Sequence, residues 1–292
     1  MMVKFTKRIL LIALISCLLG AVLCVVAVCT GGFTELGQKG IAFIDRNGID
    51  ISGINLANMG IFNDDYEGDL IETTSLDDKF EIPVDVDEID SLKIEVAAAK
   101  LNVVYSDDDK IKVGCSDEWY KFVYIIDGGE LVLKTSDVAT RIGATKAADL
   151  LIEIPEELEC EDIEMELAAG EFKLVPLQVN NNIKVELAAG TASFEGLEAE
   201  NIELEVGAGD LNTLYMDTKN LKAEVGMGNL NINMSGAEKD YNYDVEVGMG
   251  NLDIGDGAQK SFLAGETQIN NNADKNIELE VGMGNMTIGF VE

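Results

Sequence analysis

Seven glutamates recur at one position of a repeated segment, and they are the residues best suited to chemistry in this chain. From the second copy onward they are 20, 19, 19, 22 and 34 residues apart. If the copies stack as neighbouring strands, the carboxylates lie about 4.8 Å apart and repel one another. A divalent cation such as calcium, which prefers oxygen ligands, would offset that repulsion. The seven are Glu95, Glu166, Glu186, Glu205, Glu224, Glu246 and Glu280.

The glutamate pattern therefore predicts a column that binds calcium weakly, with Glu186, Glu205, Glu224, Glu246 and Glu280 as its ligands. Lys93, Lys184 and Lys222 lie two residues before their glutamates and provide diagonal ion pairs in some copies. The alternative is a solvated acidic face that discourages aggregation.

Most familiar catalytic arrangements are excluded by composition. The 292 residues include no histidine, which removes the Ser-His-Asp and Cys-His arrangements and the commonest nitrogen ligand of zinc. Beyond the apolar N-terminal segment the only arginines are Arg46 and Arg141, whereas polysaccharide-cleaving β-helix enzymes generally rely on basic residues among carboxylates. We therefore expect no enzymatic activity and no cofactor.

Glycines follow six of the seven glutamates in a Gly-x-Gly or Ala-Ala-Gly sequence, and Glu95 has Ala99 at the corresponding position. A dinucleotide-binding motif needs a third glycine and a following helix, but here a second apolar-alternating segment follows, as in Asn229–Ile232. The glycines are therefore predicted to form tight corners, where a missing side chain allows positive φ or close backbone approach. They are Gly170, Gly190, Gly209, Gly228, Gly250 and Gly284.

The elements that hold these residues are predicted to be strands. Apolar residues lie three and one residues before each glutamate and one after it, as in Ile202, Leu204 and Val206 around Glu205. This period of two is typical of a strand with one buried face. Together with the period near 20 it predicts an all-β fold, a β-solenoid or β-helix-like stack of strand–turn–strand repeats. A β-sandwich is the alternative, and the 34-residue interval is expected to hold a degenerate repeat around 261–265.

Four regions follow from the pattern of charge and hydropathy. Residues 1–8 are a basic flank, 9–29 an uncharged apolar transmembrane helix, 30–78 a linker, and 79–292 the β-repeat domain. The apolar run is long enough to span a bilayer, and its basic flank places the N-terminus in the cytoplasm and the rest outside. Cleavage as a secretory signal and lipidation at Cys17 are the alternatives.

The bulk composition describes a folded, acidic, extracytoplasmic domain. The net charge of −33 excludes nucleic acid as a partner, because phosphate binding needs a basic face. The 47% of hydrophobic residues is enough for a core. Cys115 and Cys160 lie outside the apolar run and could form a disulfide, or remain two structural thiols.

The strand Leu150–Ile154 followed by Pro155, and the Glu-Val-Gly-x-Gly-Asn/Asp-Leu repeats that begin at Glu205, Glu224 and Glu246, resemble the bacterial "putative adhesin" β-strand-repeat family. The resemblance covers residues 80–292 and implies a surface-exposed domain of unknown function with no catalytic residues. The expected function is a membrane-anchored, adhesin-like binding module of the cell envelope, with a cell-wall ligand, a surface ligand or a membrane protein as partner. The alternatives are an accessory or sensory component of an envelope-stress system and, third, a polysaccharide-acting enzyme.

Overall fold

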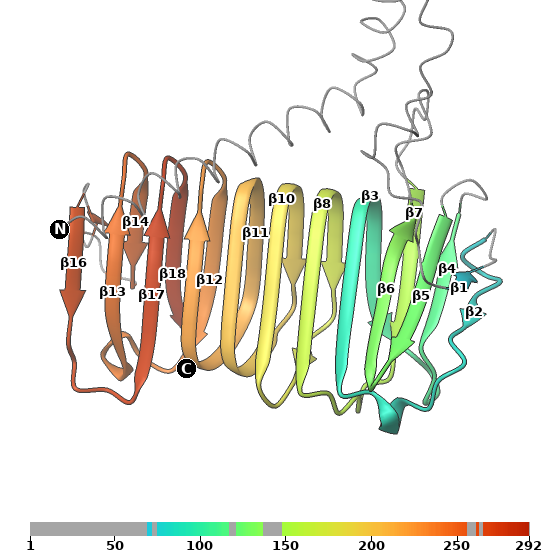
Figure 1. The fold of residues 1–292 in the computed structure, drawn as a ribbon. Coiled ribbons are helices and arrows are strands. Elements are labelled where there is room, and N and C mark those ends of the chain that lie inside the picture. The colour runs from blue at the N-terminus through green and yellow to red at the C-terminus, as the bar shows by residue number, and fades with distance from the viewer. Residues whose placement is uncertain are drawn as a thin grey trace, which may run out of the picture.

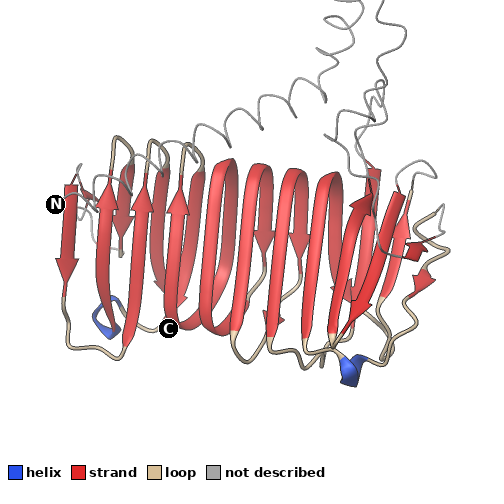
Figure 2. Ribbon diagram, in the orientation of Figure 1, coloured by secondary structure: helices blue, strands red, loops and turns tan. Residues whose placement is uncertain are grey.

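The computed structural model describes residues 69–71, 75–116, 121–136, 148–255, 261–262 and 265–291, which form strands, turns and two short 3-10 helices, Val86–Glu88 and Glu238–Asp240. Figures 1 and 2 show the strands side by side in one elongated stack. No helix within these residues is long and apolar enough to cross a membrane. The predicted membrane segment 9–29 and Cys17 lie outside the described residues.

Each repeat forms one rung of the stack, with two arms joined at the glycine corner. In β10 (Asn182–Phe194), Ile183, Val185 and Leu187 of the first arm and Phe194 of the second are buried. The alternation gives each arm one apolar and one polar face, and the two apolar faces enclose the core. Because every rung buries its apolar residues against its neighbours, the core runs the length of the stack.

Equivalent strands pair in parallel and in register, as the repeat predicts. β3 (Ser91–Tyr105) pairs with β8 (Asp162–Leu174), β8 with β10, and β10 with the N-terminal half of β11 (Leu197–Val225). A short strand, β9 (Leu177–Gln178), adds to β11. This parallel arrangement is the one expected of a stack of repeats rather than of a sandwich built from hairpins.

The rungs do not follow one another in sequence order at the C-terminal end. The last strands of the chain, β17 (Lys275–Val281) and β18 (Asn285–Val291), lie between two earlier rungs. On one side they pair with β11 and β12 (Asn229–Ser235), and on the other with β13 (Tyr241–Val247) and β14 (Asn251–Ile254). The chain thus leaves a gap one rung wide and fills it with its final rung (Figure 1).

The predicted degenerate rung around 261–265 is wrong. β15 (Ser261–Phe262) and β16 (Gly265–Ile269) instead run antiparallel to β14 and β13. They cover the last rung of the stack, whose backbone edge would otherwise be exposed to pairing with another chain.

The N-terminal end likewise has a rung out of sequence order and a cover of antiparallel strands. β6 (Glu130–Ser136) and β7 (Ala148–Ile154) pair in parallel with β3, so β3 lies between them and β8 although it precedes both in sequence. Antiparallel strands β4 (Lys112–Cys115) and β5 (Lys121–Asp127) cover that rung, and β2 (Phe80–Glu81) and β1 (Asp69–Ile71) pair with them. β1 falls within the predicted linker 30–78, so the end of that region belongs to the sheet.

Candidate functional site

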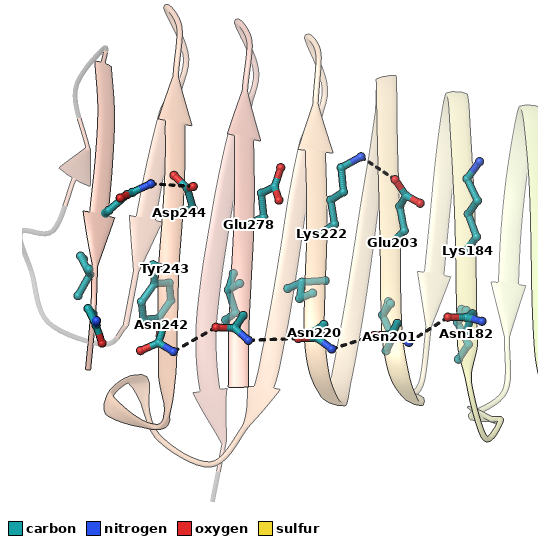
Figure 3. Close-up of a pocket in the computed structure, with 18 residues that line it drawn as sticks. Asn182, Lys184, Asn201, Glu203, Asn220, Lys222, Asn242, Tyr243, Asp244 and Glu278 are labelled. Carbon is teal, nitrogen blue, oxygen red and sulfur yellow. Dashed lines mark hydrogen bonds and ion pairs between the residues drawn. The ribbon is translucent and has the colours of Figure 1, made fainter. Parts of the chain in front are cut away.

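A groove of about 710 Å³ crosses the outer face of the first-arm sheet. It runs perpendicular to the strands, over β10, β11, β17, β13 and β16, as Figure 3 shows. Two rows of outward-pointing side chains border it, and β11 contributes two residues to each row while β10, β17 and β13 contribute one. The repeat therefore generates two parallel lines of polar groups spaced at the distance between strands, about 4.8 Å.

The first row is a ladder of asparagines, each four residues before its glutamate. Asn201 donates to the Oδ1 of Asn182 at 3.0 Å, and Asn220 donates to the Oδ1 of Asn201 at 2.9 Å. Asn276 continues the ladder to Asn220 at 3.3 Å, and Asn242 to Asn276 at 3.1 Å. Because each of these bonds uses one amide group of each partner, the ladder holds the side chains in one orientation across the sheet.

The second row lies two residues before the glutamates on the parallel strands, alternates in charge and then becomes acidic, and Gln268 of the antiparallel β16 ends it. Lys222 contacts Glu203 at 2.6 Å, and Gln268 donates to Asp244 at 3.0 Å. Burial disfavours the Lys222 ammonium, but hydrogen bonds to Glu203 and Glu224 prevail and raise its pKa. In order across the sheet, the row is Lys184, Glu203, Lys222, Glu278, Asp244 and Gln268.

The glutamates form a continuous column on the same face, in an order that the sequence does not give. Glu280 lies between Glu224 and Glu246, because β17 lies between β11 and β13. The structure adds an eighth member, Glu266 of β16, opposite Glu246. At the other end Lys134 of β6 lies opposite Glu95. A hollow of about 310 Å³ lies beside the column over the first rungs, lined in part by Glu95, Glu166, Glu186 and Glu205.

Lysines neutralise the glutamates of the earlier rungs. Lys93 contacts Glu166 at 2.7 Å and Glu95 at 3.2 Å, and Lys222 contacts Glu224 at 2.7 Å. The Lys93–Glu166 contact is a diagonal ion pair of the kind that the lysine positions predict, whereas the other two contacts each lie within one strand. The rungs of β17 and β13 have Glu278 and Asp244 at the lysine position, so their negative charge is not offset in the same way.

The pKa values of two glutamates of the column are raised. Burial raises the pKa of Glu280 to about 7, and the neighbouring charges of Glu224 and Glu246 add to the shift. Burial also raises the pKa of Glu205, and Glu186 and Glu224 add to that shift. Charge repulsion thus remains at both Glu205 and Glu280, and it favours a proton or another cation there.

The described residues contain no group of three or more carboxylate or thiol side chains placed to hold a metal ion. The glutamates are spaced along a line, one on each rung, and do not converge on one point. Calcium binding by Glu186, Glu205, Glu224, Glu246 and Glu280 stays a prediction, with cations bridging neighbouring carboxylates rather than entering a closed cage.

The corner glycines are required by close packing between rungs. A Cβ on Gly228 would lie 1.9 Å from the carbonyl oxygen of Gly209, and one on Gly250 would lie 2.1 Å from that of Gly284. The same holds, at 1.8–2.7 Å, for Gly170, Gly190, Gly209 and Gly284. Only Gly170 and Gly190 of this set have positive φ, so close approach is the reason common to all six.

Cys115 and Cys160 are both buried thiols and are not joined in a disulfide. Burial, with a smaller contribution from Asp162, raises the pKa of Cys160 to about 12. A thiol that is buried and protonated in this way is unreactive. The two cysteines therefore match the alternative prediction of two structural thiols and not the prediction of a disulfide.

The asparagine ladder is the part of the site that was not predicted from the repeat. The signal was present, because Asn182, Asn201, Asn220, Asn242 and Asn276 all lie four residues before a glutamate of the column. A second ladder on the other arm, five residues after the glutamates, joins Asn229, Asn285 and Asn251 at 2.8 Å each. An aligned column of amides in parallel strands indicates hydrogen bonding along the stack.

Residues 89–284, which include every rung described above except β18, the second arm of the last rung, match the model of the family described as Toastrack DUF4097. The chain belongs to the toastrack family. The resemblance to a "putative adhesin" repeat family is confirmed at this level, and the toastrack match covers the groove, the glutamate column and the corner glycines.

Solved structures with a similar arrangement include proteins described as a putative cell adhesion protein from Clostridium sporogenes and a putative adhesin from Bacteroides fragilis. The first is 14% identical, with a TM-score of 0.38 over 73% of this chain and 99% of the other. The second is 13% identical, with a TM-score of 0.38 over 75% of this chain and 100% of the other. No curated protein matches the chain in sequence. The toastrack family assignment therefore rests on the family match.

Proposed function

We propose that this toastrack protein is a non-catalytic, adhesin-like binding module of the bacterial cell envelope, and that the groove beside the asparagine ladder is its binding surface. The observation that carries the proposal is the regular line of amides, from Asn182 to Asn242, along a groove of about 710 Å³. An open groove that crosses several strands suits an extended ligand better than a small molecule, which binds in an enclosed cavity.

The chemistry of the groove favours an uncharged or amine-bearing polysaccharide. Amide and carboxylate groups on its rim can exchange hydrogen bonds with hydroxyl and amide groups of a sugar chain. A polyanionic polymer would meet Glu278 and Asp244 on the rim and a net charge of −33 on the whole chain. Like-charge repulsion therefore disfavours anionic wall polymers.

The proposal is tested by sedimentation of the full chain, kept in mild detergent, with insoluble cell-wall glycan. Asn220→Ala combined with Asn276→Ala removes the centre of the ladder, and we expect binding to weaken at least about tenfold because several hydrogen bonds are lost. Asn229→Ala with Asn285→Ala is the matched control, since it breaks the ladder on the other arm, outside the groove. Equal binding by both double variants, or no binding by the native chain, would exclude the groove as a glycan site.

We further propose that residues 9–29 anchor the domain in the membrane, with the N-terminus in the cytoplasm. The support is the uncharged run of membrane-spanning length after Lys4, Lys7 and Arg8. Protease added to intact cells should remove the β-repeat domain and leave an N-terminal tag protected. Protection of the domain until the membrane is permeabilised would contradict this orientation.

A further inference from the structure

Three methionines occupy the same position of the repeat on three neighbouring rungs. Met227, Met283 and Met249 are each the central residue of a Gly-Met-Gly corner, three residues after a glutamate of the column. The Met283 amide donates to the carbonyl of Gly226 at 2.6 Å, and the Met249 amide donates to that of Gly282 at 2.7 Å. These bonds hold the three corners one strand spacing apart, with Met283 in the middle.

The three side chains are exposed where the other described methionines are not. The exposed fractions are 38% for Met227, 50% for Met283 and 81% for Met249. Met165, Met216, Met234 and Met286, in contrast, are at most 1% exposed. Figure 1 shows the corresponding corners, between β11 and β12, β17 and β18, and β13 and β14, as loops that project at one edge of the stack.

Methionine is not required for the corner itself. Four other rungs have an alanine at this position, namely Ala98, Ala169, Ala189 and Ala208. Contiguous exposed apolar side chains carry a cost in water and mark sites of interaction. A line of three exposed thioethers on adjacent rungs therefore needs an explanation beyond folding.

Thioether sulfur is a soft, uncharged ligand that selects soft metal ions such as Cu(I) over hard cations. We propose that Met227, Met283 and Met249 form a binding site for a soft monovalent cation, Cu(I) or Ag(I). Adjacent rungs are about 4.8 Å apart, and the three rotatable bonds of each methionine let the outer sulfurs turn toward the central one. The site is separate from the glycan groove and does not depend on the proposed function.

The electrostatic surroundings favour a cation at this edge. The same three rungs contribute Glu224, Glu280 and Glu246 to the column, and two of them have Glu278 and Asp244 at the position that Lys222 occupies in the third. A negative field of this kind raises the local concentration of a cation. Carboxylates provide attraction for any cation, and the sulfurs provide the selectivity.

The test is a silver titration of the full chain, kept in mild detergent and labelled with ¹³C at the methionine methyl groups. Any thiol that is accessible to Ag(I) is filled first, but the methyl resonances report only on methionine. We expect the resonances of Met227, Met249 and Met283 to shift together and saturate at one equivalent beyond the thiols. Calcium at the same concentration should leave them unchanged.

Met283→Leu removes the central sulfur at nearly constant volume. We expect it to weaken silver binding, followed at Met227 and Met249, by at least about tenfold, since changes even in the outer shell of a metal site cost 10–100-fold. Met286→Leu is the matched control, because Met286 is in the same rung but buried, and it should leave the affinity unchanged. The proposal is overturned if the three resonances do not move after the thiols are filled, if they shift independently, or if both variants bind alike.

Discussion

Glu280 is the residue at which the order of the rungs most changes the chemistry. In sequence it is the last glutamate of the column, but in the stack it lies between Glu224 and Glu246. Its pKa of about 7 follows from burial and from these two neighbours. A carboxyl whose pKa is raised on folding stabilises the fold below its ordinary pKa, and this contribution is lost as pH rises through the folded-state value.

Glu280→Gln should therefore raise the melting temperature at pH 8 and have little effect at pH 5. At pH 8 the native carboxylate is charged and repelled, whereas glutamine is neutral, so we expect a gain of about 2–4 °C, which corresponds to roughly 1 kcal/mol for a domain of this size. Thermal melting followed by circular dichroism at both values of pH measures the difference.

The control for Glu280→Gln is Glu186→Gln, because the Glu186 carboxylate forms an ion pair with Lys184. That substitution removes an attraction rather than a repulsion, so no gain at pH 8 is expected. An equal gain in both variants would mean that the stabilisation comes from lowering the total charge.

Calcium should act on the same repulsion. At pH 8 and millimolar calcium we expect the melting temperature of the native chain to rise by about 1–2 °C, since a ligand present near its Kd contributes about 0.4 kcal/mol. Glu280→Gln should reduce this rise, and sodium at equal ionic strength serves as the control. If millimolar calcium does not change the melting temperature, the column does not bind calcium and the alternative of a solvated acidic face is supported.

At the scale of the element, the glycine corner determines how closely two rungs approach. The outward side chains of neighbouring arms align into ladders only because the backbones meet at hydrogen-bonding distance along the whole rung. The carbonyl of Gly209 occupies the space where a side chain on Gly228 would lie. Corner glycines and asparagine ladders are thus two results of the same in-register stacking.

Gly228→Ala should destabilise the domain by about 3 kcal/mol or more, because its Cβ would lie 1.9 Å from backbone that cannot move without separating the rungs. Urea unfolding compares it with Gly196→Ala, where the nearest atom to the new Cβ is the Pro176 side chain at 3.3 Å. We expect the control to change stability by less than about 1 kcal/mol. Similar losses in both would show that the loss in Gly228→Ala does not come from the close approach of the rungs at the corner.

At the scale of the whole molecule, both ends of the stack are closed in the same way. At each end, the rung next to the outermost one is out of sequence order: β3 at the N-terminal end, and β17 with β18 at the C-terminal end. Antiparallel strands cover the outermost parallel rung at both ends. The final rung, β17 and β18, therefore connects the body of the stack to β13, β14 and their cover. Removal of that rung would separate β11 and β12 from β13 and β14, although all four strands precede it in sequence.

A chain that ends after Asp274 should lose protection from hydrogen exchange in β13 and β14 while keeping it in β8 and β10. The reason is that β13 and β14 lose their parallel partners, whereas β8 and β10 keep theirs. The full-length chain under the same conditions is the reference. Unchanged protection in β13 and β14 would mean that these strands pair directly with β11 and β12 when the gap is empty.

The sequence by itself determined the strands, their buried faces and the existence of a stack. A period of two needs only local geometry, as in Ile202, Leu204 and Val206, and the recurrence of that pattern near every 20 residues indicates repeats that cover one another. The glutamate column and the corner glycines follow from the same register. The asparagine ladders were also within reach, because they lie at fixed distances from the glutamates.

Only the tertiary structure decided which rung lies beside which. Similar repeats present nearly the same edge to any neighbour, so local pattern does not distinguish β13 from β17 as the partner of β11. That choice depends on the connections between rungs and on the cover of each end, which involve contacts distant in sequence. For this reason the raised pKa of Glu280, the groove that passes from β11 to β16, and the line of Met227, Met283 and Met249 became visible only in three dimensions.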